Sequence, residues 1–299
     1  MTASALPAPT TEQAATRNAW IPLVATGILF AVLFVRPALL LAGDWWNNPE
    51  AGHGLLLTPV ALWLAWKARI RPGARSNLTA GVAILVFAVL LRFAAGLAAE
   101  LFTMKASMLF ALVGLVTAYW GFRQVLHWWL PFTLLALAIP LPELILNAVA
   151  LPLQFKASQI GAALLKARDI PVLLAGNVIR VPGHELFVAE ACSGLRSLTA
   201  LLSLSILLGG MLLRMPITRV FLVAIAIPIA VLINGVRIFL TGFLILFVSP
   251  DAADGFMHTT EGWAMFVIAF AILGVVAWGA SWLENRFMRP AAVQEPVDA

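Results

Sequence analysis

The sequence has little of what a soluble protein needs. Of its 299 residues 62% are hydrophobic and only 11% are charged, whereas about a quarter of an average soluble domain is charged. It contains one tyrosine and one cysteine, Cys192. A single cysteine excludes an internal disulfide, so side-chain packing alone has to hold the fold together. The composition therefore excludes an ordinary soluble domain and indicates a protein that dissolves in lipid.

Nucleic-acid binding and metal chemistry are also disfavoured. The formal net charge is +5, but the Lys and Arg residues stand in short stretches between apolar runs. A nucleic-acid-binding protein would gather them on one polar surface. His, Cys and Asp do not recur at metal-ligand spacing, so we predict neither a metal nor another cofactor. The remaining partner that the composition indicates is the lipid bilayer.

The apolar runs predict about eight transmembrane helices. Seven runs are long enough to cross about 30 Å of hydrocarbon, and an eighth is shorter. The long runs lie at 20–42, 78–97, 101–121, 124–145, 197–213, 218–247 and 262–283, and the short one at 54–67.

The basic residues predict the orientation of these spans, because Lys and Arg in short loops stay on the cytoplasmic side. The loops 43–53, 98–100 and 249–261 contain acidic residues but no Lys or Arg. We therefore expect these loops outside, both termini in the cytoplasm, and a multi-pass protein of the cell inner (plasma) membrane. The basic residues that follow this alternation are Arg17, Lys67, Arg69, Arg71, Arg75, Arg123, Arg214, Arg219, Arg286 and Arg289.

One long outer segment, 143–191, has a pattern of its own. It follows Pro140 and Pro142 and continues as an amphipathic stretch to about Arg168, which we expect to lie along the membrane surface. After Pro171 short apolar runs alternate with turn residues, which predicts a small β-ribbon that leads into Cys192. The predicted fold class is an all-α polytopic membrane protein with a small extracytoplasmic β-ribbon before the Cys192 helix.

The domain organisation follows from the same runs. We expect a polar cytoplasmic N-terminus at 1–19 and a single transmembrane catalytic domain at 20–285. A cytoplasmic tail follows at 286–299. The sequence contains no internal repeat.

Cys192 is the first candidate for chemistry because of its position. It stands between the predicted ribbon and the start of the sixth span, where helix N–H groups favour a thiolate. Arg196 adds positive charge one helical turn later, and Glu190 and Ser193 flank the cysteine. The alternative interpretation is a small packing residue. The position favours a nucleophile.

His258 and Arg237 are the matching candidates. His258 lies in the outer loop before the last span, on the same predicted side as Cys192, and its imidazole can exchange a proton near neutral pH. Arg237 lies inside the seventh span, where burying a guanidinium in hydrocarbon would cost at least about 2.5 kcal/mol of insertion free energy. Asn234, three residues earlier, shares its helix face. The alternative for Arg237 is a structural ion pair with an outer carboxylate.

A set of cations in the outer part of the predicted spans suggests a cationic cavity. It would receive a carbonyl or an anionic group, with Glu190, Glu143 or Glu261 as possible partners. The set consists of Arg36, Arg92, Lys105, Arg196 and Arg237.

Three motifs in order resemble the exosortase/archaeosortase family of membrane transpeptidases. They are Glu190 to Ser197 around the cysteine, Asn234 to Ile238, and His258 ahead of Gly262 and Trp263. His53 and the Pro140-Leu141-Pro142 stretch are supporting matches.

The resemblance implies a catalytic constellation of Cys192, Arg237 and His258. It also implies substrates that are membrane-anchored proteins ending in a Pro-Glu-Pro-like sorting signal, an apolar helix and a basic tail. The expected reaction is cleavage near that signal through a thioester, followed by transfer to an amine-bearing lipid or to water. His53 is expected to support the outer site.

Two other functions fit parts of the pattern. One is a transporter or flippase in which intramembrane arginines bind an anionic substrate. The other is a non-catalytic assembly factor for exopolysaccharide. Only the cysteine enzyme requires Cys192.

Overall fold

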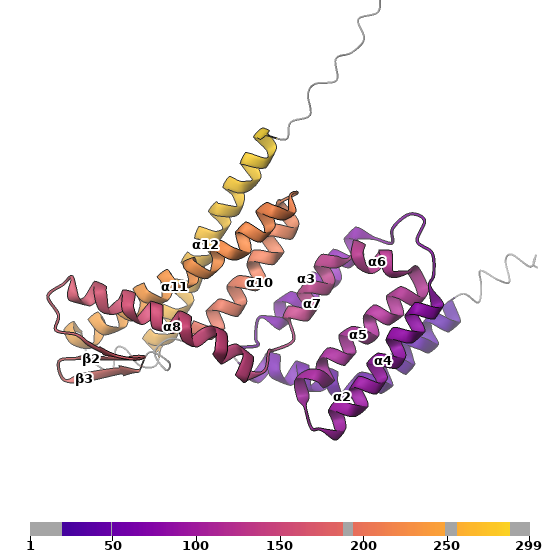
Figure 1. Cartoon of the computed structure of the whole chain (residues 1–299), viewed down its shortest axis with the longest axis horizontal. Helices are drawn as coiled ribbons and strands as arrows, with labels where there is room; N and C mark the ends of the chain where they lie inside the picture. The colour runs from indigo at the N-terminus through magenta and orange to yellow at the C-terminus, as the bar shows by residue number, and fades with distance from the viewer. Residues whose placement is uncertain (1–19, 49, 188–193, 249–255, 288–299) are drawn as a thin grey trace, which may run out of the picture. The chain divides into compact units, whose positions relative to one another are not determined.

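The computed structural model describes residues 20–48, 50–187, 194–248 and 256–287, and these residues are mostly helical (Figure 1). The helices are α2 Trp20–Asn47, α3 Gly54–Ala68, α4 Leu78–Leu97, α5 Leu101–Trp120, α6 Phe122–His127, α7 Trp129–Leu137, α8 Glu143–Lys166, α10 Gly194–Leu212, α11 Pro216–Phe247 and α12 Phe256–Phe287. The strands are β1 Leu173–Ala175, β2 Val178–Val181 and β3 His184–Phe187.

The chain is a multi-pass membrane protein by the length and composition of its helices. Six described helices (α2, α4, α5, α8, α11 and α12) are long and apolar enough to cross a bilayer, and α3 and α10 are shorter apolar helices. The mostly helical fold with a small antiparallel sheet confirms the predicted fold class. Which face of the membrane each end occupies stays a prediction.

The predicted span at 124–145 is wrong as a single helix. The structure has α6 and α7 there, separated at Trp128, and the chain then leaves helical geometry before α8 begins at Glu143. Pro140 and Pro142 cannot donate a backbone N–H, so they end the helical run. The Trp128 indole donates to the Arg69 carbonyl at 3.0 Å, which joins the break to the end of α3.

Helix α8 confirms that the amphipathic stretch is helical, and the helix packs along α11. The small residues Ala157 and Gly161 face Gly235 on α11. By length and composition α8 is also one of the six described helices that could cross a bilayer. Its position along the membrane surface stays a prediction.

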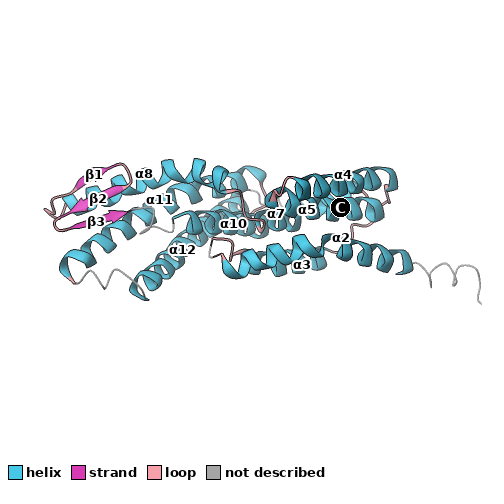
Figure 2. Cartoon of the chain, turned by 90° about the horizontal axis from the view of Figure 1, so that it is seen from below, coloured by secondary structure: helices cyan, strands magenta, loops and turns pink. Residues whose placement is uncertain are grey.

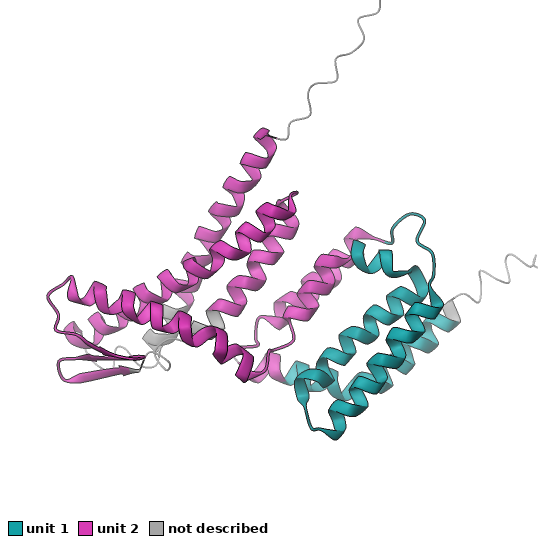
Figure 3. Cartoon of the chain, in the orientation of Figure 1, with its two compact units in different colours: residues 1–43, 70–127 teal, residues 44–69, 128–299 magenta. Residues whose placement is uncertain are grey.

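The structure divides into two compact units, 1–43 with 70–127 and 44–69 with 128–299 (Figure 3). In the first unit α4 and α5 form a tight antiparallel pair, because Gly81 and Gly114 let the backbones approach. Glu100 caps α5 by accepting the N–H groups of Phe102 and Thr103 at 2.9 and 2.6 Å. Its hydrogen bond with the Thr103 side chain is the main cause of a lowered pKa.

In the second unit a buried carboxylate joins three helices at one end. Glu284 of α12 accepts the backbone N–H groups of Arg214 and Met215 at 2.8 and 3.0 Å and the Thr218 hydroxyl. It therefore caps the N-terminus of α11 from another helix. Arg219 donates twice to the Leu213 carbonyl, at 3.0 and 2.8 Å, and so satisfies the end of α10. We call this group of residues the Glu284 turn.

The predicted β-ribbon is confirmed as a three-stranded antiparallel sheet in the order β1-β2-β3 (Figure 2). Its buried face, with Ile179 and Leu186, packs into one cluster with Leu165 of α8 and Ile238 of α11. The sheet therefore covers the ends of α8 and α11 that are far from the Glu284 turn.

We expect Glu284→Ala to lower the free energy of unfolding by about 3 kcal/mol, because hydrogen bonds to a charged group contribute about 1.5–3 kcal/mol each and the N–H groups of Arg214 and Met215 lose their acceptor. Denaturant titration of the detergent-purified protein, followed by tryptophan fluorescence, measures the change. Glu185→Ala is the matched control: it breaks the exposed ion pair with Arg180, which is worth less than about 1 kcal/mol. Equal losses in the two variants would contradict the assignment.

Candidate active site

The structure describes only some of the predicted site residues. Cys192, Glu190 and Ser193 lie outside the described residues. Arg196 and His258 lie in described backbone, in the first turns of α10 and α12, but their side chains are outside the description. Both backbone and side chain are described for Arg237 and Asn234 of α11 and for His53, the residue before α3.

Two predicted helix boundaries change near the site. His258 was expected in the loop before a span at 262–283, but α12 begins at Phe256, so His258 lies in its first turn. Helix α10 begins at Gly194, three residues before the predicted start and two residues after Cys192. Both shifts bring candidate residues to helix N-termini, where unpaired N–H groups favour negative charge.

The end of α10, the start of α11 and Glu284 of α12 meet at the Glu284 turn, so distances along the three helices can be counted from it. Gly194 is 20 residues before Arg214, about 30 Å along a helix with a rise of about 1.5 Å per residue. Arg237 is 22 residues beyond Met215, about 33 Å, and His258 is 26 residues before Glu284, about 39 Å. Because α11 packs against both α10 and α12, the three positions lie toward the same end of the unit.

Arg237 is buried in the protein, with 4% of its surface exposed. It neighbours the closest approach of α8 and α11. A Cβ on Gly235 would lie 2.5 Å from Ile160 Cγ2, and one on Gly161 would lie 2.5 Å from Ile238 Cγ2. The two glycines let the helix backbones meet beside the arginine. The crossing therefore fixes the backbone of α11 beside Arg237.

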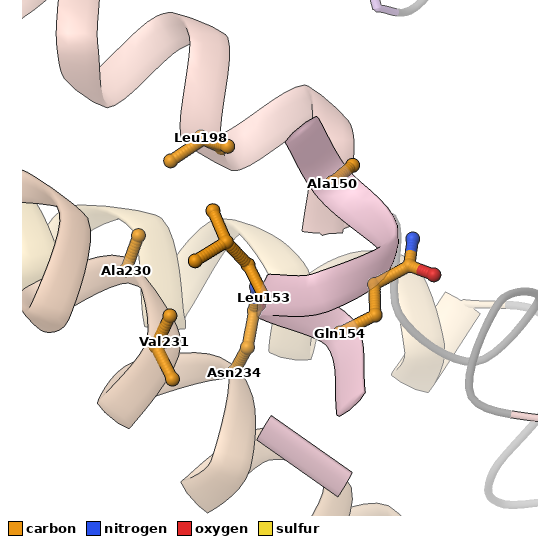
Figure 4. A pocket seen from close by; sticks show the side chains of 7 residues that line it. All are labelled: Ala150, Leu153, Gln154, Leu198, Ala230, Val231 and Asn234. Atoms are coloured by element: carbon orange, nitrogen blue, oxygen red, sulfur yellow. The ribbon is translucent and has the colours of Figure 1, made fainter. Parts of the chain in front are cut away.

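A small pocket lies next to Arg237, between α8, α10 and α11 (Figure 4). The Leu153 side chain extends toward Leu198 and Ala230, whereas the Gln154 amide points away from them. The lining residues are Ala150, Leu153, Gln154, Leu198, Ala230, Val231 and Asn234. Asn234 therefore lies both in this lining and three residues from Arg237.

His53 is held against the end of α7. Its Nε2 lies 3.1 Å from the Leu137 carbonyl, which can only accept, so the Nε2–H donates. Trp45 makes a parallel contact, in which its indole donates to the Ala138 carbonyl at 2.7 Å. Burial lowers the pKa of His53, and hydrogen bonds to the Leu137 and Glu50 backbone oppose part of the shift. The His53 contact joins the start of α3 to the end of α7, and the Trp45 contact joins the end of α2 to it. A role of His53 at the site stays a prediction.

The predicted cationic set does not form one described cluster. Arg36 is exposed, Lys105 is buried, and Arg92 packs against the rings of Phe34 and Phe93. These three cations belong to the first unit and Arg237 to the second. The cavity hypothesis therefore stays untested. Among the described residues no group of three His, Cys, Asp or Glu side chains could hold a metal ion.

Sequence reasoning missed Glu284 and the Gly161–Gly235 crossing. A carboxylate near the end of an apolar span was a usable signal, because an acidic residue there needs hydrogen-bond donors. The glycines gave no comparable signal, since their importance depends on which helix faces α11.

These features define a class: a multi-pass helical membrane protein with a buried arginine beside a small antiparallel sheet. Comparison with protein families then gives a specific assignment. The chain belongs to the transmembrane exosortase family (Exosortase_EpsH), whose family model matches residues 45–275. The match includes Cys192, Arg237 and His258, and it confirms the resemblance seen in the motifs. Membership implies processing of protein substrates that carry C-terminal sorting signals. No curated protein and no solved structure matches the chain.

We expect Gly235→Val to destabilise the second unit and to reduce sorting-signal processing. The added side chain overlaps Ile160, and overpacking of this kind costs about 1–3 kcal/mol. Relief of the overlap would push α8 away from α11 beside Arg237. The thermal unfolding midpoint and the fraction of processed substrate measure the two effects.

Gly279→Val is the matched control, because a Cβ on Gly279 meets no atom within 4 Å. It should leave both measurements unchanged. A Gly235→Val protein that unfolds and processes its substrate like the wild type would contradict the close crossing.

Proposed function

We propose that this protein is a membrane-embedded cysteine peptidase and transpeptidase. It cleaves the C-terminal sorting signal of membrane-anchored secreted proteins and passes them to an acceptor. Cys192 is the nucleophile, His258 the proton donor and acceptor, and Arg237 the group that stabilises the oxyanion. The site faces the extracytoplasmic side, in line with the charge pattern of the loops.

The observation that carries this proposal is how the chain on each side of Cys192 is fixed to α11. On the N-terminal side, Leu186 of β3 lies 3.3 Å from where a Cβ of Gly242 would be. On the C-terminal side, Leu198 of α10 lines the pocket with Ala230 and Asn234. Arg237 lies between these two points on α11. The elements before and after the cysteine segment therefore both pack on the part of α11 that carries Arg237, and this supports the assignment of Cys192 and Arg237 to one site.

The first chemical step is attack of the Cys192 thiolate on the carbonyl carbon of the scissile peptide bond. A C–S bond forms, the carbonyl electrons move to oxygen, and collapse of this intermediate breaks the C–N bond to give a thioester. The thiol proton passes to His258, which then donates it to the leaving amine. The N-terminus of α10 favours the thiolate because its first N–H groups have no partner within the helix.

Arg237 suits the oxyanion because it is buried on a helix whose backbone is held by close packing. Donors that are held in place before reaction need no reorganisation when charge develops, and a medium of low dielectric strengthens their effect. The second step is attack on the thioester by an amine or by water. An amine-bearing lipid gives transfer, and water gives hydrolysis, so exclusion of water from the site favours transfer.

We expect Cys192→Ala to abolish processing and to accumulate the full-length precursor. The probe is a membrane-anchored reporter that ends in a Pro-Glu-Pro sorting signal, an apolar helix and a basic tail. Immunoblotting measures the precursor, and mass spectrometry of the wild type during turnover should detect an acyl adduct on Cys192. A transporter or an assembly factor would keep working without the thiol, so a fully processed reporter in the Cys192→Ala strain would overturn the proposal.

We expect Arg237→Lys to reduce the processing rate by about 10²–10³-fold, the usual effect of losing one oxyanion donor. Lysine keeps the charge but loses the planar fork of the guanidinium. The rate is measured as precursor decay after a pulse of reporter synthesis. Arg180→Lys, on the exposed side of the sheet, is the control and should process normally. A similar rate in both variants would remove Arg237 from the mechanism.

A further inference from the structure

Strand β3 forms a free edge of the sheet. Within the described part of the chain it pairs with β2 alone, so β1 and β3 are the two outer strands (Figure 2). At the opposite edge β1 lies against α8, whereas His184 and Glu185 of β3 are exposed. The sequence of β3 contains neither proline nor lysine, residues that commonly protect an exposed edge from pairing. The edge is therefore open to an added strand.

The hairpins show which backbone groups of β3 point to this edge. Two residues separate β2 from β3, and such a loop is closed by a pair of residues that exchange hydrogen bonds, here Val181 and His184. Because bonded pairs alternate along an antiparallel ladder, His184 and Leu186 bond to β2. Glu185 and Phe187 point their N–H and C=O groups away from β2. These four groups have no partner among the described residues.

An added strand with proline at every second position fits this edge in one register only. The N–H and C=O groups of one residue point to the same side of a strand, and its neighbours point to the other side. In a Pro-x-Pro segment the middle residue therefore turns both groups to one side, and the prolines, which lack an N–H, turn to the other. Pairing through the middle residue loses no hydrogen bond to β3. The shifted register would lose two donors.

Chain length links the edge to the candidate nucleophile. Phe187 is five residues before Cys192, and five residues span at most about 18 Å when fully extended. This upper limit holds for any path of the chain between them. A peptide segment on β3 thus lies within a few residues of the thiol, as cleavage near a sorting signal requires.

We propose that the Pro-Glu-Pro sorting signal of the substrate binds as a fourth strand on the free edge of β3. Its glutamate pairs through its backbone with the outward groups of Glu185 and Phe187, and its prolines face away, where they prevent a fifth strand from pairing. The alternation is the same for both chain directions. This assignment rests on the proposed function, and it adds a binding site that reads the spacing of the prolines through backbone groups.

Backbone methylation of a synthetic substrate tests the register. The peptide carries the Pro-Glu-Pro signal, an apolar helix and a basic tail, and the wild-type protein processes it in detergent. N-methylation of the glutamate removes the facing N–H but keeps the side chain, so we expect processing to slow by about tenfold. N-methylalanine in place of the first proline is the matched control. It carries the same methyl group on an outward-facing nitrogen and should be processed at the rate of the unmodified peptide. Equal rates for the two methylated peptides would overturn the proposal.

Amide hydrogen exchange tests occupancy without turnover. The full-length Cys192→Ala protein is mixed with the unmodified peptide, and exchange is measured residue by residue by mass spectrometry. We expect exchange at Phe187 to slow by about tenfold or more with the peptide, whereas Leu186, which bonds to β2, exchanges slowly in both states. Unchanged exchange at Phe187 under saturating peptide would overturn the proposal. So would slowing that depends on protein concentration without peptide, because a second copy of the chain would then occupy the edge.

Variants of the two edge strands test the donor on the protein. Phe187→Pro and Phe187→Ala both lose the side chain, but only the proline loses the outward N–H, so Phe187→Pro should process the peptide about tenfold more slowly than Phe187→Ala. Leu174 has the corresponding outward N–H on β1. Leu174→Pro and Leu174→Ala should process at equal rates. The same Pro-to-Ala ratio at both positions would overturn the proposal.

The outcomes separate the edge from the enzyme. Equal rates for the methylated peptides overturn the edge, even where Cys192→Ala abolishes processing. Cleavage of the unmodified peptide by the Cys192→Ala protein overturns the proposed function instead, and the exchange at Phe187 then decides the edge. If a proline variant does not fold, as shown by its thermal unfolding, the methylated peptides and the exchange experiment decide the question.

Discussion

The buried Glu284 carboxylate is the interaction on which the second unit depends. It caps α11 from α12, while Arg219 satisfies the last carbonyl of α10, so three helices share one level at the Glu284 turn. A helix end in an apolar environment cannot leave its N–H and C=O groups to water. Once this end is fixed, helix length alone sets the level of each residue at the opposite end. Gly194, Arg237 and His258 thus lie about 30, 33 and 39 Å along their helices from this contact.

Close helix packing then sets the lateral position of Arg237. Within a bilayer helices gain little from burying apolar surface, so they associate where small residues allow close contact. Gly161 and Gly235 provide this contact between α8 and α11, and the sheet closes over the same ends through Leu165 and Leu186. A rigid surrounding of this kind suits a group that must hold a developing charge without moving.

The sequence predicted most of the fold because apolar run length and β-ribbon alternation are local signals. It predicted the sheet before Cys192, and seven of the eight predicted runs are single helices, five of which (α2, α4, α5, α11 and α12) are long and apolar enough to cross a bilayer. The prediction failed at 124–145, because hydropathy does not show the helix break at Trp128. The Trp128 indole donates a hydrogen bond to the carbonyl of Arg69, which is distant in the sequence. The sequence did not predict that α8 packs on α11, because the match of its small residues to Gly235 depends on tertiary contact. For the candidate site, residue type and order led to the choice of Arg237, Asn234 and His258. The Glu284 turn could not be predicted in this way, because its hydrogen bonds join residues that are 66 to 70 positions apart in the sequence.

The length of α11 bears on the cost of its arginine. The helix has 32 residues, whereas about 20 suffice to cross the hydrocarbon. A hydrocarbon layer that begins at the Glu284 turn would end close to Arg237, about 33 Å away. The sequence alone suggested a guanidinium well inside a span. A helix of this length has room for α8 and the sheet to pack on one part of it and for α10 and α12 to pack on another, and the buried Arg237 belongs to the part against which α8 and the sheet pack.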